Sequence, residues 1–158
     1  MTNAAIVTTE ILEAYLLCPY KASLLLAGHT GTKTDYEIAV GELRDGVRQK
    51  AIEKLYHGQH RRPVQQGGTL SDGSAIVLDR RLEIDGFSVQ VDGLRRADGP
   101  SSLGDFHYEP LLFHEGRKVR ELPRLLIRAH AVLLARVQGR LPNRGVVYHW
   151  CQITCRIP

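Results

Sequence analysis

The sequence predicts a mixed α/β domain of the α+β kind, in which helices flank a central mixed sheet with a strand meander. Two segments near the N-terminus carry apolar residues at helical spacing, short β-prone runs follow them, and a third helical segment precedes a last strand. The 158 residues are enough for one domain with its own core. We therefore expect a single domain over 1–158, with a helical N-terminal part at 1–57 and a sheet-and-helix core at 75–158.

Three segments are expected to be helical. The first covers 8–26, where Thr9 can cap the start and Pro19 predicts a kink or a break into two short helices. The second covers 35–57, and the third covers 119–138. Pro123 favours a later start of the third helix, near Leu122.

The strands are expected in the second half of the chain, after a loop rich in Gly, Gln and Arg at 58–74. The Asp85-Gly86 dipeptide predicts a hairpin, because both positions suit positive φ. Turns are expected at 98–102 and 139–145. The expected strands are 75–78, 82–84, 87–91, 106–113 and 146–153.

The net charge of +4 is unevenly distributed. From Arg117 to the end there are nine Lys and Arg residues and one acid, Glu121. Such a basic C-terminal segment is compatible with DNA as a partner, because phosphate contacts release counterions. An ordinary solvated basic face explains the same charge. The candidates for backbone contacts recur every four residues in the third helix: Arg120, Arg124 and Arg128.

The composition also narrows the cellular setting. No run approaches the roughly 18 apolar residues of a membrane helix, and the N-terminus has no basic and apolar signal regions. The three cysteines, Cys18, Cys151 and Cys155, are too few and too odd for a disulfide framework. We expect a cytoplasmic protein with no membrane partner.

Two acids are placed where they can carry chemistry. Asp92 follows the strand at 87–91 and precedes Gly93, and Glu109 lies within an apolar run. A charged residue in such a run must face solvent, a partner or a metal ion. Two carboxylates on neighbouring strands can share a hard cation such as Mg²⁺ or Mn²⁺. A solvent-facing Glu and a turn Asp explain the same two residues.

Several segments together resemble a known family. Residues 9–22, TEILEAYLLCPYKA, look like the first helix of RecB-like nucleases, and the later pattern is similar too: VDG at 91–93, DFHYEPLLF at 105–113, a long apolar helix, and GVVYH at 145–149. The chain resembles the RecB-like PD-(D/E)XK nucleases, which are related to the exonucleases of CRISPR adaptation. The resemblance covers nearly the whole chain. It implies a restriction-endonuclease-like core, metal-dependent hydrolysis of DNA, and a helicase or other domain supplied elsewhere. It also suggests a shortened copy of a longer protein.

The family's site has an Asp at the end of one strand and a Glu-X-Lys on the next. The resemblance places Asp92 on the first position and Glu109 on the second, as metal ligands, but the lysine position falls on Leu111. In some members the lysine comes from another element, and Lys118 is the candidate here. An ordinary solvated lysine explains Lys118 equally well.

Two further family elements are also missing. Where many members have Gly-X3-His in an early helix, this chain has Gly41 and Asp45, and where they have Gln-X3-Tyr it has Arg128 and Val132. We therefore expect a metal-dependent DNA nuclease with an impaired site. The alternative is a non-catalytic nucleic-acid-binding or scaffolding module derived from the same fold.

The cysteines raise the question of an iron–sulfur cluster. Some relatives bind one through one cysteine ahead of the nuclease core and three after it. This chain has Cys18 ahead, and only Cys151 and Cys155 after. Because a [4Fe–4S] cluster usually takes four thiolates, the sequence argues against a cluster. Cys18 is expected to pack as a small apolar residue.

Overall fold

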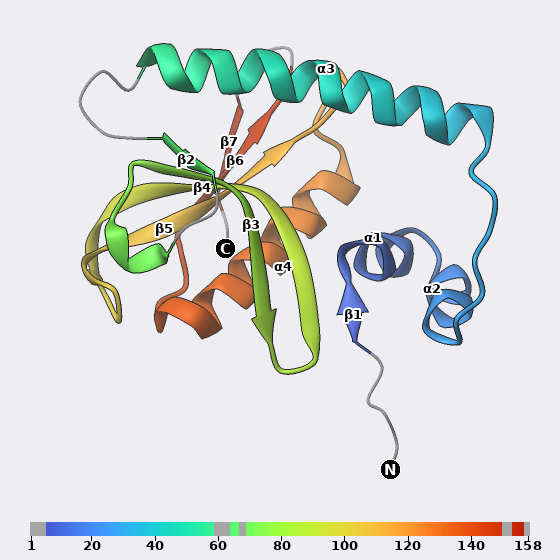
Figure 1. Ribbon diagram of the computed structural model, residues 1–158, viewed down its shortest axis with the longest axis horizontal. Helices are drawn as coiled ribbons and strands as arrows, with labels where there is room; N and C mark the ends of the chain where they lie inside the picture. The colour runs from blue at the N-terminus through green and yellow to red at the C-terminus, as the bar shows by residue number, and fades with distance from the viewer. Residues whose placement is uncertain (1–5, 59–63, 67–68, 150–152, 157–158) are drawn as a thin grey trace.

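A mixed β-sheet forms the centre of the molecule (Figure 1). The computed structural model describes residues 6–58, 64–66, 69–149 and 153–156. Within them the sheet has seven strands, in the order β2-β3-β4-β5-β6-β7, with β1 pairing in parallel with β4. The strands are β1 (Val7–Thr8), β2 (Val64–Gln66), β3 (Ile76–Ile84), β4 (Phe87–Ser101), β5 (Gly104–Phe113), β6 (Arg144–Tyr148) and β7 (Ile153–Arg156). The predicted mixed α/β class is confirmed.

The sheet combines a meander with a crossover. Strands β3, β4 and β5 are antiparallel neighbours, and β6 returns parallel to β5. The connection between β5 and β6 contains helix α4 (Glu121–Gln138), as expected for parallel neighbours that need a crossover. Strand β2 pairs in parallel with β3, and β7 pairs antiparallel with β6.

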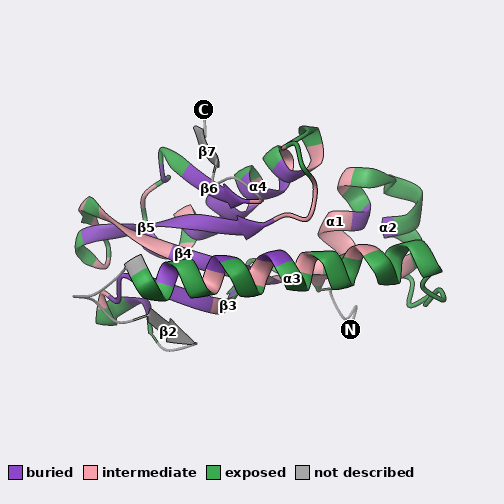
Figure 2. Ribbon diagram, turned by 90° about the horizontal axis from the view of Figure 1, so that it is seen from above, coloured by how far each residue is buried: buried purple, intermediate pink, exposed green. Residues whose placement is uncertain are grey.

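Helices cover both faces of the sheet (Figure 2). Helix α3 (Asp35–Gly58) lies across one face, where Ala51 and Leu55 pack with sheet residues such as Leu78 and Leu111. Helix α4 packs on the other face through two groups of buried residues, one of which includes Leu134. Helix α1 (Thr9–Leu17) lies on the α4 side, since its residues Leu12 and Leu16 pack against that core.

The first predicted helix is broken in two. Helix α1 ends before Cys18, which has extended backbone angles, and α2 (Pro19–Leu26) begins at Pro19. Proline fits the first helical position because its missing N–H needs no partner there. The side chain of Thr8, rather than that of Thr9, accepts a hydrogen bond from the Ile11 N–H at the start of α1.

The predicted hairpin at Asp85-Gly86 is confirmed. Both residues have positive φ, 47° and 82°, and Ile84 pairs with Phe87 across the turn. The primed turns of two-residue hairpins require such angles, which match the twist of the flanking strands.

Other expected boundaries were wrong. The runs at 75–78 and 82–84 belong to one strand, β3, and the expected turn at 98–102 lies largely within β4, which continues through a register shift between Asp98 and Ser101. The expected last strand is two antiparallel strands, β6 and β7. The expected loop at 58–74 contains β2 and a 3-10 turn at Leu70–Asp72.

Gln138, at the end of α4, completes the edge of β5 where β6 does not reach. Its side chain is fully buried and accepts from the Tyr108 N–H at 2.8 Å while donating to the Tyr108 carbonyl at 3.1 Å. It also donates to the Arg140 carbonyl at 2.9 Å. One amide thus satisfies backbone groups that would otherwise be buried without partners.

Replacing this amide should destabilise the protein. In Gln138→Leu, the buried N–H and carbonyl of Tyr108 lose their partners, so we expect the free energy of unfolding to fall by about 2–4 kcal/mol. Urea denaturation measures the change. Gln49→Leu, at an exposed position of α3, is the matched control, and similar losses in both variants would contradict this role of Gln138.

Candidate functional site

Asp92 lies in the middle of the sheet, opposite Asp79, where the regular pairing of β3 and β4 is interrupted at one position. The pairs Leu78–Gly93 and Arg80–Val91 leave Asp79 of β3 and Asp92 of β4 between them. Asp79 has a φ of 54°, in the left-handed region that non-glycine residues seldom adopt. The Asp92 carboxylate accepts a hydrogen bond from the Phe113 N–H of β5 at 2.7 Å. An irregular stretch of sheet thus holds two acids side by side.

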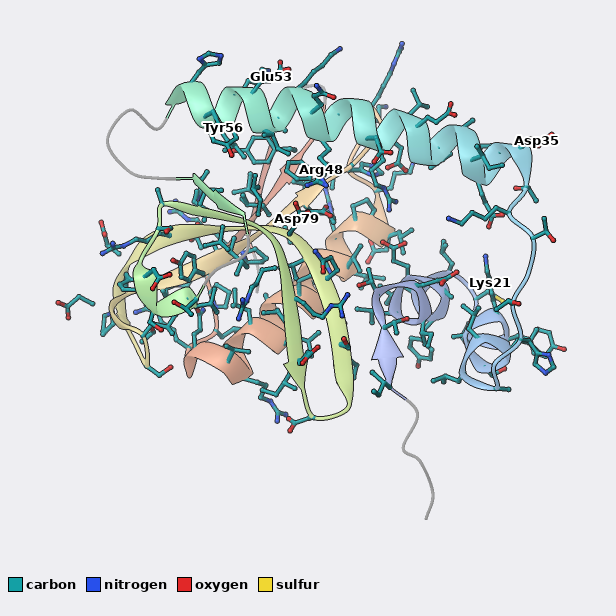
Figure 3. The ribbon with its side chains drawn as sticks, viewed as in Figure 1. Lys21, Asp35, Arg48, Glu53, Tyr56 and Asp79 are labelled. Atoms are coloured by element: carbon teal, nitrogen blue, oxygen red, sulfur yellow. The ribbon has the colours of Figure 1, made fainter. Side chains whose placement is uncertain are left out.

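Two arginines of α3 lie over this region. Arg48 pairs with Asp79 at 2.5 Å, and Figure 3 shows it reaching from α3 toward Asp79 on β3. Arg44, one turn earlier on the same face, pairs through Nε with Glu115 at 3.0 Å and through a terminal nitrogen with Glu13 of α1 at 3.4 Å. Helices α1 and α3 and the end of β5 are therefore linked by alternating charges.

Burial and charge set the protonation of these acids. Burial raises the pKa of Asp92 from 3.8 to about 6, although the Phe113 N–H and the charges of Arg44 and Arg48 act to lower it. Burial also acts to raise the pKa of Glu115. There the hydrogen bonds from His114, the backbone and Arg44 outweigh it and hold the pKa at about 2.

The structure does not bring Glu109 to Asp92. Glu109 is buried in β5 and pairs at 2.6 Å with Arg95, its cross-strand neighbour on β4. It lies four positions before Phe113, whose N–H binds Asp92, and that corresponds to about 13 Å along the strand. Ligands of one Mg²⁺ lie within about 2.1 Å of the ion. These two carboxylates are therefore not placed to share it.

The remaining candidates of the nuclease site are also apart. Lys118 lies exposed in the segment between β5 and α4, and no contact with Asp92 is found among the described residues. Leu111 is fully buried in the core under α3. Asp45 is exposed on α3, so the helix turns its arginines, rather than Asp45, toward the sheet.

Among the described residues, the side chains are not arranged to hold a resident metal ion. In the part of the chain that the structure describes, no group of three or more His, Cys, Asp or Glu side chains could hold one. Asp92 and Glu109 each have a partner from the protein, the Phe113 N–H and the Arg95 guanidinium. The catalytic roles of Asp92, Glu109 and Lys118 stay predictions.

Of the three cysteines, the structure describes the side chain of Cys18 alone. Cys18 is exposed between α1 and α2, so the expectation that it packs as an apolar residue was wrong. Its position between two short helices leaves it outside the core. Cys151 lies outside the described residues, and for Cys155 the structure describes only backbone in β7.

A row of exposed arginines is the other candidate site. Arg120 precedes α4, and Arg124 and Arg128 follow on successive turns of the helix. All three are exposed, and none of them forms an ion pair with a described residue. Along the helix axis, each arginine lies about 6 Å beyond the one before it, and the side chains can bind an external anion.

Sequence reasoning missed Glu13, Arg44, Arg48, Asp79 and Glu115. The spacing of Arg44 and Arg48 puts both on one face of a helix, and Val47 and Ala51 mark that face as the buried one. This signal was present in the sequence. The bend that places Asp79 beside Asp92 has no such signal, because an Asp-Arg-Arg run within a strand gives no indication of positive φ.

The comparisons with known proteins do not assign a family. No family model matches the chain, and no curated protein matches it.

None of the described helices is both long enough and apolar enough to cross a membrane.

The raised pKa of Asp92 predicts a pH-dependent stability. Because its folded pKa of about 6 exceeds the ordinary 3.8, the stabilisation linked to its proton is present below about pH 4 and lost as the pH rises through 6. Above pH 6 the charged carboxylate thus lowers the free energy of unfolding by about 1–3 kcal/mol. Asp92→Asn keeps an acceptor for the Phe113 N–H and removes that cost.

We expect Asp92→Asn to be more stable than the parent above pH 6, with the difference vanishing near pH 4. Urea denaturation from pH 4 to pH 8 measures this. Asp45→Asn, at an exposed site, is the control and should follow the parent. Parallel pH profiles of Asp92→Asn and the parent would show that the carboxyl does not titrate as inferred.

Proposed function

We propose that this chain is a nucleic-acid-binding module on a RecB-like nuclease fold, in which the metal-dependent site is impaired. The inference that the site is impaired rests on one observation: arginines of the protein itself lie beside the two acids. Arg95 pairs with Glu109, while Arg44 and Arg48 lie near Asp92. A guanidinium beside a carboxylate supplies the positive charge that a divalent cation would otherwise bring.

The topology supports the choice of fold. The resemblance implies helices, then a strand meander, a helix and a further strand, which is the order of α1, β3–β5, α4 and β6. It also implies an Asp on one strand beside a second strand that carries further site residues. Asp92 on β4 binds the backbone of β5 and so meets this requirement.

The basic row of Arg120, Arg124 and Arg128 supports nucleic acid as the ligand. Their advance of about 6 Å per turn is close to the spacing of phosphates along an extended strand. Exposed guanidinium groups bind phosphate oxygens bidentately and release counterions in doing so. Such contacts bring affinity without reading sequence. A helicase or other domain supplied elsewhere remains a proposed partner.

The alternative is an active DNA nuclease dependent on Mg²⁺ or Mn²⁺, with Asp92, Glu109 and Lys118 as its residues. The buried carboxyl of Asp92 favours it, because pKa values raised by burial are common among catalytic groups. The separation of Asp92 from Glu109 along the sheet speaks against it. For this alternative, Asp92 and Glu109 would have to move together to bind one cation.

Removing the row should weaken DNA binding. We expect the triple variant Arg120→Gln, Arg124→Gln, Arg128→Gln to bind a labelled single-stranded oligonucleotide at least about ten-fold more weakly at low salt. The slope of log K against log salt should fall by about 2, because up to three phosphate contacts are lost. Fluorescence anisotropy over a salt series measures both quantities.

A matched control removes three exposed basic residues outside the row. These are Lys33, Arg81 and Arg144, each changed to Gln. Both triple variants have the same net charge, so a general electrostatic effect would weaken them equally. Equal binding by both would sink the proposed interface, and absence of DNA binding by the parent protein would sink the proposed function.

A cleavage assay distinguishes the impaired module from the active nuclease. We expect the purified chain with Mg²⁺ or Mn²⁺ to cut labelled single-stranded or duplex DNA no faster than its Asp92→Ala variant does. Gel analysis over hours measures the products. Cleavage by the parent that Asp92→Ala abolishes would overturn the impaired site and establish the nuclease.

A further inference from the structure

A cavity lies on the α3 face of the molecule, away from the row on α4. Its volume is about 250 Å³, and it is formed between the C-terminal half of α3 and the end of β6. Val47, Ala51 and Tyr148, all buried residues, provide its apolar floor. Such a floor favours a flat ring over a hydrated ion.

The rim of this cavity is basic. Lys50, Lys54 and His57 follow one another on successive turns of α3 and all line the cavity, and His149 lines it from the end of β6. The lysine ammonium groups supply point charges suited to phosphate. An apolar floor beside a cationic rim matches a ligand with an aromatic ring at one end and a phosphate at the other.

One acid limits the number of phosphates. Glu53 lines the same cavity between the two lysines in sequence. Its carboxylate repels additional phosphates, while it can accept a hydrogen bond from a ribose hydroxyl or a base amino group. The volume sets a second limit, since pockets for drug-sized ligands are usually about 300–1,000 Å³. About 250 Å³ therefore suits one nucleotide unit and excludes a dinucleotide.

Aromatic contacts connect the cavity with the charged cluster. Tyr148 in the cavity floor packs on Phe113, with ring centroids 6.0 Å apart. The Arg48 guanidinium lies over the Phe113 ring, 6.0 Å from its centroid. The backbone N–H of Phe113 binds Asp92. A ring seated on Tyr148 thus lies one aromatic residue away from the Asp92 region, on the same face of the sheet.

We propose that this cavity binds a nucleoside monophosphate unit, with the base over the floor formed by Val47, Ala51 and Tyr148 and the phosphate at Lys50 and Lys54. The unit is either a free mononucleotide or the 5′-phosphorylated end of a strand, which share this chemistry. The site is separate from the arginine row and does not rest on the proposed function.

Calorimetric titration of the full chain with AMP, adenosine and inorganic phosphate tests the ligand class. We expect AMP to bind with a Kd below about 1 mM, and adenosine and phosphate each at least about ten-fold more weakly, because each contacts only half of the site. Phosphate binding as tightly as AMP, or no AMP binding up to about 10 mM, would overturn the proposal.

Two lysine variants test the location of the nucleotide site. Lys54→Gln should weaken AMP binding about ten-fold or more, whereas Lys33→Gln, an exposed lysine ahead of α3, should leave it unchanged. Equal affinities of the two variants would overturn the assignment. Lys54→Gln should also leave the binding of an oligonucleotide without a 5′-phosphate by the α4 row intact, so the two proposals are tested independently.

Competition distinguishes the two sources of the ligand. Displacement of AMP by a short oligonucleotide with a 5′-phosphate, but not by the same oligonucleotide without it, identifies a strand end. AMP binding that neither oligonucleotide disturbs identifies a free mononucleotide. Both results uphold the nucleotide class, and displacement to the same extent by both oligonucleotides would contradict the role given to the phosphate.

Discussion

The pairing of α3 arginines with acids of the sheet is the constraint on which the rest of the molecule depends. Asp79 and Asp92 lie in an irregular stretch of two central strands, where unpaired carboxylates would be costly. Arg48 neutralises the first directly, and the charges of both arginines lower the pKa of the second. Because Arg44 also joins Glu13 and Glu115, one helix face fixes α1, α3 and the end of β5 relative to one another.

This constraint divides the molecule into two functional faces. On the α3 side, the arginines form ion pairs with the protein and are committed to holding it together. On the α4 side, the arginines at 120, 124 and 128 have no acid partner among the described residues. Charge that is already paired within the protein adds little to the attraction of a polyanion, whereas unpaired charge adds counterion release. Contacts with the backbone along a bound strand are therefore expected on the α4 face, although α3 carries comparable numbers of basic residues.

The sequence predicted the parts of this structure that depend on local periodicity or local turn chemistry. The break at Pro19, the span of α3 and the Asp85-Gly86 hairpin each follow from a few neighbouring residues. Boundaries within the meander did not, because strand ends there depend on pairing with segments far along the chain. The site was harder still. Asp92 was singled out by its position at the end of an apolar run, but its partners come from α1, α3 and the end of β5, and no spacing in the sequence brings them together.

Leu111 shows that the difference from a lysine-bearing site involves more than one side chain. It is fully buried under α3, and a Cβ added to the opposite residue, Gly93, would lie 3.2 Å from both Leu111 and Leu78. Glycine at this position of β4 therefore allows two leucines to close over the strand. A lysine at 111 would have to place its ammonium within that apolar contact, where burial strongly disfavours the charged form. The same packing that completes the core under α3 thus excludes the lysine, and a single substitution at 111 cannot restore it without reopening the core.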